Sequence, residues 1–299
     1  MKAGPIYKQH QLVLISPAST VSRERLNLKY NKYVFRTAYT DSTEAGDLIS
    51  YMRQSQPPLK RAVIVKHPDQ EEVYSDSLSY EFKKQLTTNN QEQVVEICTV
   101  DEKISDDEQK RIIQNCIRNH QNNADVILVA LARKSLENKE HVFFNDNRNL
   151  KVLGGDTMYS INLTTEYSNA IKEKLVVSVP WNRSNRNKQK SSFEKESEHL
   201  WGKVNWRTAM TYDATKAMVD ALKNKNDNPS REDLYNALKD NFSTESATGK
   251  EVKFCDNSDR KPDTGLGVLV KVEDLSYDHT KPQLDFVITN TPTRNESCM

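Results

Sequence analysis

Residues 61–66 read Arg-Ala-Val-Ile-Val-Lys, a short apolar run between basic residues that decides the fold class. Such a run is typical of a strand that is buried on both faces of a parallel sheet. A helical pattern follows over residues 75–86, with its apolar side chains on one stripe, and a second strand pattern covers residues 94–98. Strand, helix and strand in this order predict a βαβ unit.

The alternation of strand and helix continues toward the C-terminus. Ser105 and Glu108 have the spacing of a capping box at the start of the next helix. Buried strands are predicted at 125–130, 151–156 and 175–180. We therefore predict an α/β fold with a parallel sheet that helices cover on both faces.

Shorter patterns flank this region on both sides. Strands are predicted at 11–16 and 33–37, a helix begins at Asp41, and the polar stretch 182–192 is predicted to be a loop or linker. Beyond it the sequence predicts helices over 206–222 and after the N-cap Ser230, strands over 251–255 and 267–272, and an irregular tail from residue 276 with one apolar run at 286–288.

The charge balance argues against polyanionic partners. The 43 basic and 42 acidic residues leave a formal net charge of +1, so the chain has no strong positive field toward nucleic acid or an anionic membrane. No stretch approaches the roughly 20 consecutive apolar residues that span a bilayer. The first ten residues lack a basic segment followed by a long apolar run, so we expect no secretory signal in them. We expect neither nucleic-acid binding nor direct membrane insertion.

Motifs for catalysis and for metal binding are absent from the sequence. There is no dinucleotide fingerprint, no P-loop, no G-x-S-x-G elbow and no H-E-x-x-H pair. The four cysteines are scattered without C-x-x-C spacing, which indicates neither a zinc site nor a dense disulfide framework and leaves their pairing open. We expect no enzyme activity, no catalytic residues, no metal and no cofactor.

The turn that follows the first predicted strand is the first candidate site. It reads Ser16-Pro17-Ala18-Ser19-Thr20 and lies at the carboxyl end of a parallel strand, where open α/β sheets bind ligands. Backbone N–H groups beside hydroxyl groups suit a carboxylate, because they donate charge-assisted hydrogen bonds. The alternative is an ordinary turn in which Ser19 or Thr20 caps a helix.

An ordered series of segments resembles a known family. The series comprises 15–20 (Ile-Ser-Pro-Ala-Ser-Thr), 33–38 with Asp41-Ser42, 63–65, 74–78 with Glu81-Phe82, 153–156 (Leu-Gly-Gly-Asp), 211–215, and Phe254 with 258–260. It is similar to the receptors for leucine, isoleucine and valine, the type I periplasmic binding proteins of ABC transporters. The resemblance covers residues 11–272.

The resemblance implies a set of ligand-binding residues. It places the ligand's carboxylate on Ala18, Ser19 and Thr20, Tyr74 across the cleft, and the ligand's ammonium on Asp156. An aspartate at a strand end can neutralise a buried amine. The alternatives are a helix N-cap for Asp156 and a surface aromatic for Tyr74.

The resemblance also implies two Rossmann-like lobes with parallel sheets, joined by three crossings. Residues 1–59 and 182–266 would form lobe 1, and residues 60–181 and 267–299 would form lobe 2. No counterpart of the family's opening half-lobe precedes residue 11, so we expect lobe 1 to be incomplete. Ala130-Leu131-Ala132 stands where the family often has an aromatic residue, so the ligand can differ.

The function implied is that of a solute-binding receptor for amino acids or related small solutes. It would close by a hinge on its ligand and be recognised by a membrane permease, and by resemblance it would be periplasmic or extracytoplasmic. Two alternatives stay open. One is the sensory domain of a signalling receptor; the other is an α/β enzyme using Ser19 and Asp156, although no histidine is placed to activate them.

Overall fold

The protein is described from a computed structural model, which contains no ligand. The described residues are 4–26, 31–88, 91–137, 139–144, 150–160, 163–164, 171–172, 174–183, 189–223, 228–262, 266–276, 284–290 and 298. Two compact units form: unit 1 comprises residues 1–40, 180–268 and 291–299, and unit 2 comprises residues 41–179 and 269–290.

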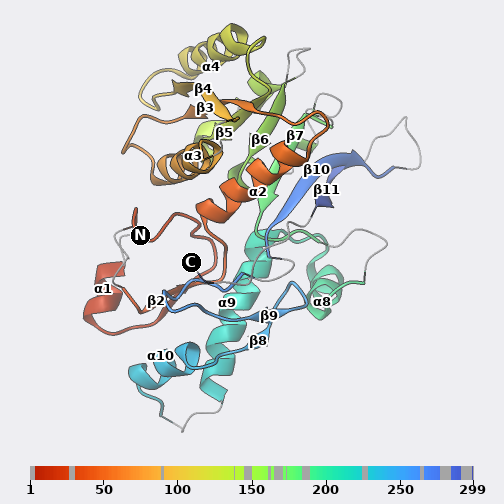
Figure 1. The fold of residues 1–299 in the computed structure, drawn as a ribbon. Helices are drawn as coiled ribbons and strands as arrows, with labels where there is room; N and C mark the ends of the chain where they lie inside the picture. The colour runs from red at the N-terminus through yellow and green to blue at the C-terminus, as the bar shows by residue number, and fades with distance from the viewer. Residues whose placement is uncertain are drawn as a thin grey trace. The chain divides into compact units, whose positions relative to one another are not determined.

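Unit 2 is built on a seven-stranded sheet (Figure 1). Its strands are β3 (Arg61–Lys66), β4 (Gln93–Thr99), β5 (Val126–Ala130), β6 (Lys151–Gly154), β7 (Leu175–Val179), β10 (Val268–Asp274) and β11 (Leu284–Asn290). The spatial order is β4-β3-β5-β6-β7-β10-β11, and β4 through β7 pair in parallel. The first five strands thus have the doubly wound order 2-1-3-4-5, which confirms the predicted α/β fold.

Burial in this sheet follows the sequence pattern. Strands β5 and β7 are buried along their whole length, as near-continuous apolar runs require when helices cover both faces. β4 is one of the two edge strands, and its residues are half-buried or exposed. Its sequence accordingly carries Gln93 and Glu96 among the apolar residues.

The three longer helices described in unit 2 agree closely with the predicted patterns, whereas the three short ones were not predicted. They are α2 (Asp41–Gln54), α3 (Val73–Leu86) and α4 (Asp106–His120), with the short α5 (Arg133–Leu136), η1 (Glu140–Phe143) and η2 (Asp156–Met158). α2 and α3 pack against each other, α2 beside β7 and α3 beside β5 (Figure 1). The Ser105 side chain accepts a hydrogen bond from the Glu108 N–H and so caps α4, as predicted. The Glu108 carboxylate accepts hydrogen bonds from Arg111, so the second half of the predicted capping box is not formed.

The tail beyond residue 276 is not irregular throughout, so that prediction was wrong. β11 pairs antiparallel with β10, with Val270 opposite Ile288 and Val272 opposite Phe286. Phe286 is buried and contacts Tyr159 with 4.5 Å between ring centroids. An apolar run of three residues could not reveal this strand, because its pairing partner and its burial come from β10.

Unit 1 contains α1 (Gly4–Gln9), β1 (Leu14–Ser16), β2 (Val34–Arg36), α8 (Ser192–Trp201), α9 (Trp206–Lys223), α10 (Arg231–Lys239), β8 (Thr244–Glu245) and β9 (Glu251–Val252). β1 and β2 pair in parallel, and α9 packs on β1 and on α10. A core cluster joins them through Ile15, Phe35, Ala214, Ala217, Ala221 and Leu238. The α10 helix begins with a complete capping box of Ser230 and Asp233.

The α8 helix was not predicted from the sequence. Ser191 caps it by accepting a hydrogen bond from the Glu194 N–H. Only Phe193 and two polar residues, Glu194 and Ser197, are buried, whereas Leu200 and Trp201 are exposed. A helix with so few buried apolar residues lacks the periodic stripe by which helices are recognised.

A buried ion pair fixes the interior of unit 1. Arg260 Nη1 lies 2.5 Å from Asp213 Oδ2, and both side chains are fully buried. Asp213 also accepts hydrogen bonds from Ser246 Oγ and from the Ala247 N–H, and Arg260 Nη2 donates to Ser246 Oγ. These bonds tie α9 to the β8–β9 region, which offsets the cost of burying both charges.

Two disulfides resolve the pairing of the cysteines. Cys98 on β4 is bonded to Cys116 on α4 within unit 2, and Cys255 is bonded to Cys298 within unit 1. Each bond therefore links parts of a single unit.

The residue ranges of the two units differ from those of the predicted lobes. The main difference is α2, which lies in unit 2 rather than with residues 1–59. The assignment of lobes remains a prediction. Among the described residues, no helix combines the length and the apolar character needed to cross a membrane.

Candidate functional site

In unit 2 the candidate site is the turn after β6. β6 ends at Gly154, Gly155 precedes η2, and Asp156 is the first residue of η2. Asp156 is 4% exposed. It therefore lies at the carboxyl end of a central parallel strand, which is where open α/β sheets bind ligands.

Glu44 on α2 holds this turn in place. Its Oε1 accepts a hydrogen bond of 2.7 Å from the Asp156 N–H. A Cβ atom at Gly155 would lie 1.7 Å from Glu44 Oε1 and 2.3 Å from Tyr74 Oη, so any larger residue there would displace the ends of these two side chains. The backbone at Gly155 thus passes between the ends of two buried polar side chains.

Tyr74 and Thr157 complete the surroundings of the turn. Tyr74 lies in the first turn of α3 and is 9% exposed, so it is not a surface aromatic. The Thr157 hydroxyl lies 3.4 Å from Tyr74 Oη and donates to the Leu131 carbonyl at 3.0 Å. Leu131 follows β5, so the carboxyl ends of β5 and β6 are joined here.

Several acidic side chains lie close together around this turn and shift one another's pKa values. Burial, together with the charges of Asp156, Asp41 and Asp47, raises the pKa of Glu44 well above its usual range. Burial, followed by the charges of Glu44 and Asp156, raises the pKa of Tyr74. A positively charged group placed here would relieve this repulsion, which makes the turn suited to an ammonium.

The predicted carboxylate turn lies in unit 1. Ala18 is exposed, Ser19 is half-buried and Thr20 is 3% exposed. Within the described residues no helix begins at Ser19 or Thr20, and neither hydroxyl makes a hydrogen bond.

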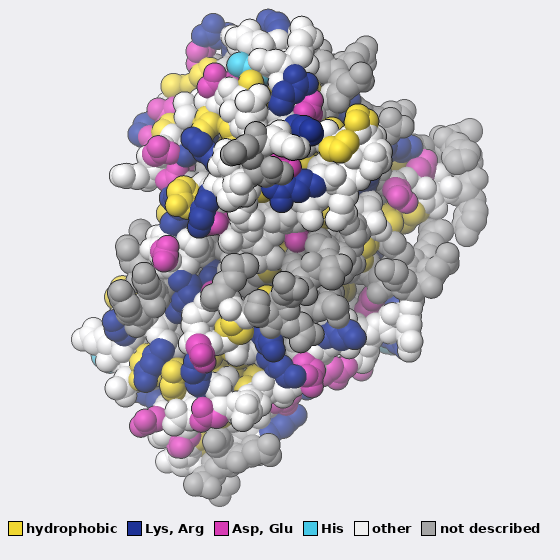
Figure 2. Space-filling view, in the orientation of Figure 1, with side chains coloured by type: hydrophobic (Ala, Val, Ile, Leu, Met, Phe, Trp, Pro, Cys, Tyr) yellow, Lys and Arg dark blue, Asp and Glu magenta, His cyan; other side chains and the backbone are white. Residues whose placement is uncertain are grey.

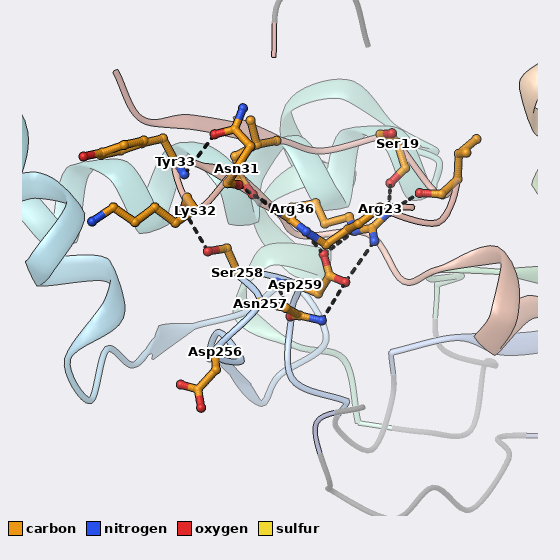
Figure 3. A network of polar contacts seen from close by, with 12 residues as sticks. Ser19, Arg23, Asn31, Lys32, Tyr33, Arg36, Asp256, Asn257, Ser258 and Asp259 are labelled. Carbon is orange, nitrogen blue, oxygen red and sulfur yellow. Dashed lines mark hydrogen bonds and ion pairs between the residues drawn. The ribbon is translucent and has the colours of Figure 1, made fainter. Parts of the chain in front are cut away.

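An arginine network binds the backbone of this turn (Figure 3). Arg36, at the end of β2, donates to the carbonyls of Ser19 at 3.4 Å and Val21 at 2.6 Å. Its guanidinium also binds both carboxylate oxygens of Asp259, at 2.6 and 2.9 Å. Arg23 joins the network through Asp259 at 3.4 Å. The backbone of the turn is thus fixed while its hydroxyls stay unused.

The structure brings some of the predicted site residues together. Tyr74 and the turn carrying Asp156 meet in unit 2, and Ala18, Ser19 and Thr20 form one turn in unit 1. Their role in binding remains a prediction. Sequence reasoning missed Glu44, because an acid in the first turn of a helix is ordinary.

On the face drawn in Figure 2, basic and acidic side chains are interspersed over both units. In the described parts of the chain no group of three or more His, Cys, Asp or Glu side chains has the arrangement of a metal site.

Comparison with solved structures identifies the fold. An ABC transporter substrate-binding protein from Desulfitobacterium hafniense has a TM-score of 0.72 at 19% identity, covering 96% of this chain and 76% of that protein. The leucine binding protein LivK from Thermotoga maritima has a TM-score of 0.71 at 19% identity, with coverages of 95% and 74%. A solute binding protein from Rhodopseudomonas palustris BisB5, in complex with 3,4-dihydroxy benzoic acid, has a TM-score of 0.68 at 15% identity, with coverages of 98% and 76%.

Sequence comparison identifies the family. No curated protein matches the chain. The family model described as periplasmic binding protein matches residues 1–271, which is most of the chain. The members of this family and the structural relatives above are solute-binding proteins and not enzymes, which confirms the prediction of no enzyme activity. The chain belongs to the periplasmic binding protein family and has its type I fold, as the resemblance in the sequence predicted.

Proposed function

We propose that this chain is the solute receptor for an ABC transporter and that its solute is an amino acid or a related small molecule with an ammonium group. The observation that carries the proposal is the buried acidic turn at Asp156, held by Glu44 beside Tyr74. Such a site favours a cation, because the acids repel one another in its absence. The turn at Ala18, Ser19 and Thr20 would take the solute's carboxylate.

The relatives support a solute-binding role and leave the chemistry of the solute open. One structure of the Desulfitobacterium hafniense protein is a complex with Leu, whereas the Rhodopseudomonas palustris protein holds 3,4-dihydroxy benzoic acid. The second compound has a carboxylate and no amine. The acidic turn in unit 2 is what favours an amine-bearing solute for this chain.

The two disulfides support a location outside the cytosol. Such bonds persist in oxidising compartments and are rare in reducing ones. We propose that the chain works in the periplasm or an equivalent extracytoplasmic space and passes its solute to a membrane permease.

Isothermal titration calorimetry against three solute sets tests the proposal. The sets are amino acids, simple amines, and aromatic carboxylates without nitrogen. We expect at least one amino acid or related amine to bind in a 1:1 complex, and the nitrogen-free carboxylates to bind more weakly, because they bring no charge that neutralises Asp156. Tight binding of the carboxylates alone would contradict the proposed solute class, and binding of none of the three sets would contradict the receptor function.

A further inference from the structure

The second carboxyl oxygen of Glu44 is without a hydrogen bond. Glu44 is fully buried, and its Oε1 binds the Asp156 N–H at 2.7 Å. Its Oε2 is also buried and has no hydrogen-bond partner among the described residues. A buried carboxyl oxygen without a hydrogen bond costs free energy. A further hydrogen-bond donor placed beside it would therefore be stabilising.

The groups around Glu44 determine which donor would suit it. Asp41 and Asp47 are its acidic neighbours on α2, Asp156 faces it from η2, and the phenol of Tyr74 faces the same turn from α3. Burial and the three aspartates hold the pKa of Glu44 well above its usual range, which favours the protonated form in the ligand-free chain. The arrival of a positive charge reverses this preference, because it stabilises the ionised carboxylate.

We propose that Glu44 is a proton-linked specificity residue of the solute site: it releases its proton to the solvent when a solute with a cationic nitrogen binds beside Asp156. The O–H bond of the Glu44 carboxyl breaks, the proton passes to the buffer, and Oε2 becomes an acceptor for an N–H of the solute. The inference rests on the proposed function. The solute class it selects has a positively charged nitrogen with two or more N–H donors, one for each of the two carboxylates.

Because solute binding is coupled to proton release, the affinity depends on pH with a definite sign. The free chain holds one more proton than the complex, so raising the pH favours the complex as long as Glu44 is protonated in the free chain. Affinity for amine-bearing solutes therefore increases with pH in this range. A carboxylate solute without nitrogen brings no cation, so it releases no proton from Glu44.

Calorimetry in two buffers measures the released proton. The amine-bearing solute that binds most tightly is titrated in phosphate buffer and in Tris buffer, whose ionisation enthalpies differ. The difference between the two observed binding enthalpies gives the number of protons released per solute bound. For the unmodified chain we expect a measurable release of protons, with a limit of one per solute bound. Glu44→Gln keeps an oxygen for the Asp156 N–H but cannot ionise, so the release should disappear and affinity should fall on the order of tenfold.

Controls separate this inference from other effects. Asp107→Asn removes an acid from the surface of α4, where the side chain is exposed and pairs with Lys110, and should bind like the unmodified chain. Amine binding by the unmodified chain without proton release overturns the inference, and so does equal release by Glu44→Gln. Neither result contradicts the proposed receptor function. Failure of every solute to bind overturns the receptor function and this inference with it. The proton count of the unmodified chain does not depend on whether a variant folds.

Discussion

Replacing Asp213 by Ala is expected to lower the free energy of unfolding of unit 1 by about 3–5 kcal/mol, because removing one partner of a buried ion pair leaves the other charge buried and uncompensated. Arg260 is the charge that would be left, and it is fully buried. Ser246 and the Ala247 N–H would also lose their acceptor on Asp213. The expected loss of stability is therefore larger than the loss on removing an ion pair at the surface.

Tryptophan fluorescence measures this change in unit 1 alone. All three tryptophans, at positions 181, 201 and 206, belong to unit 1, so denaturant titration followed by fluorescence reports its unfolding. As a control, Asp256→Ala removes the exposed pair with Lys239 and should cost about 1 kcal/mol or less. The double variant Asp213→Leu with Arg260→Met should be less destabilised than Asp213→Ala, since no charge remains buried. An Asp213→Ala protein as stable as the unmodified chain would show that the pair is not buried in solution.

Replacing Asp156 by Ala is expected to weaken solute binding by about 2 kcal/mol or more, or roughly 30-fold, because a solute ammonium loses its charged partner. The backbone N–H of residue 156 remains, so the hydrogen bond to Glu44 can persist and the turn can keep its shape. The stability of the folded chain should change much less than the free energy of solute binding. Calorimetric titration with the strongest solute gives the affinity, and thermal unfolding of the free variant gives the stability.

The matched control for Asp156 is Asp125→Ala, also in unit 2. Asp125 pairs with the half-exposed Arg61 and lies immediately before β5, at the end of the sheet opposite the candidate turn. Its removal should leave solute affinity unchanged. If Asp156→Ala binds as tightly as the unmodified chain, Asp156 serves only the local structure of the turn.

The parallel sheet of unit 2 could be predicted because its strands are buried on both faces. Val63, Ile64 and Val65 are all fully buried in β3, so their apolar run carries the signal without any knowledge of neighbouring strands. The caps at Ser105 and Ser230 were equally visible, since a side chain that binds the N–H three residues on is a local feature. These parts of the fold depend on short-range physics.

The missed elements depend on contacts between distant segments. β11 is defined by its pairing with β10, and α8 has few buried apolar residues. Glu44 is separated from Asp156 by more than a hundred residues, and only the fold makes one the partner of the other. The sequence indicated Asp156 and Tyr74 through a family resemblance, while the hydrogen bond that supports their turn could only be seen in three dimensions.

We propose that this chain holds one small solute reversibly and leaves it unchanged. The most direct measurement incubates the chain with the strongest solute of the calorimetric panel, removes free solute by rapid gel filtration, and releases the bound molecule by denaturation for mass spectrometry. We predict about one equivalent of solute with its original mass. Release of a chemically altered molecule, or no retained solute for any compound in the panel, would show that the chain is not a receptor for these solutes.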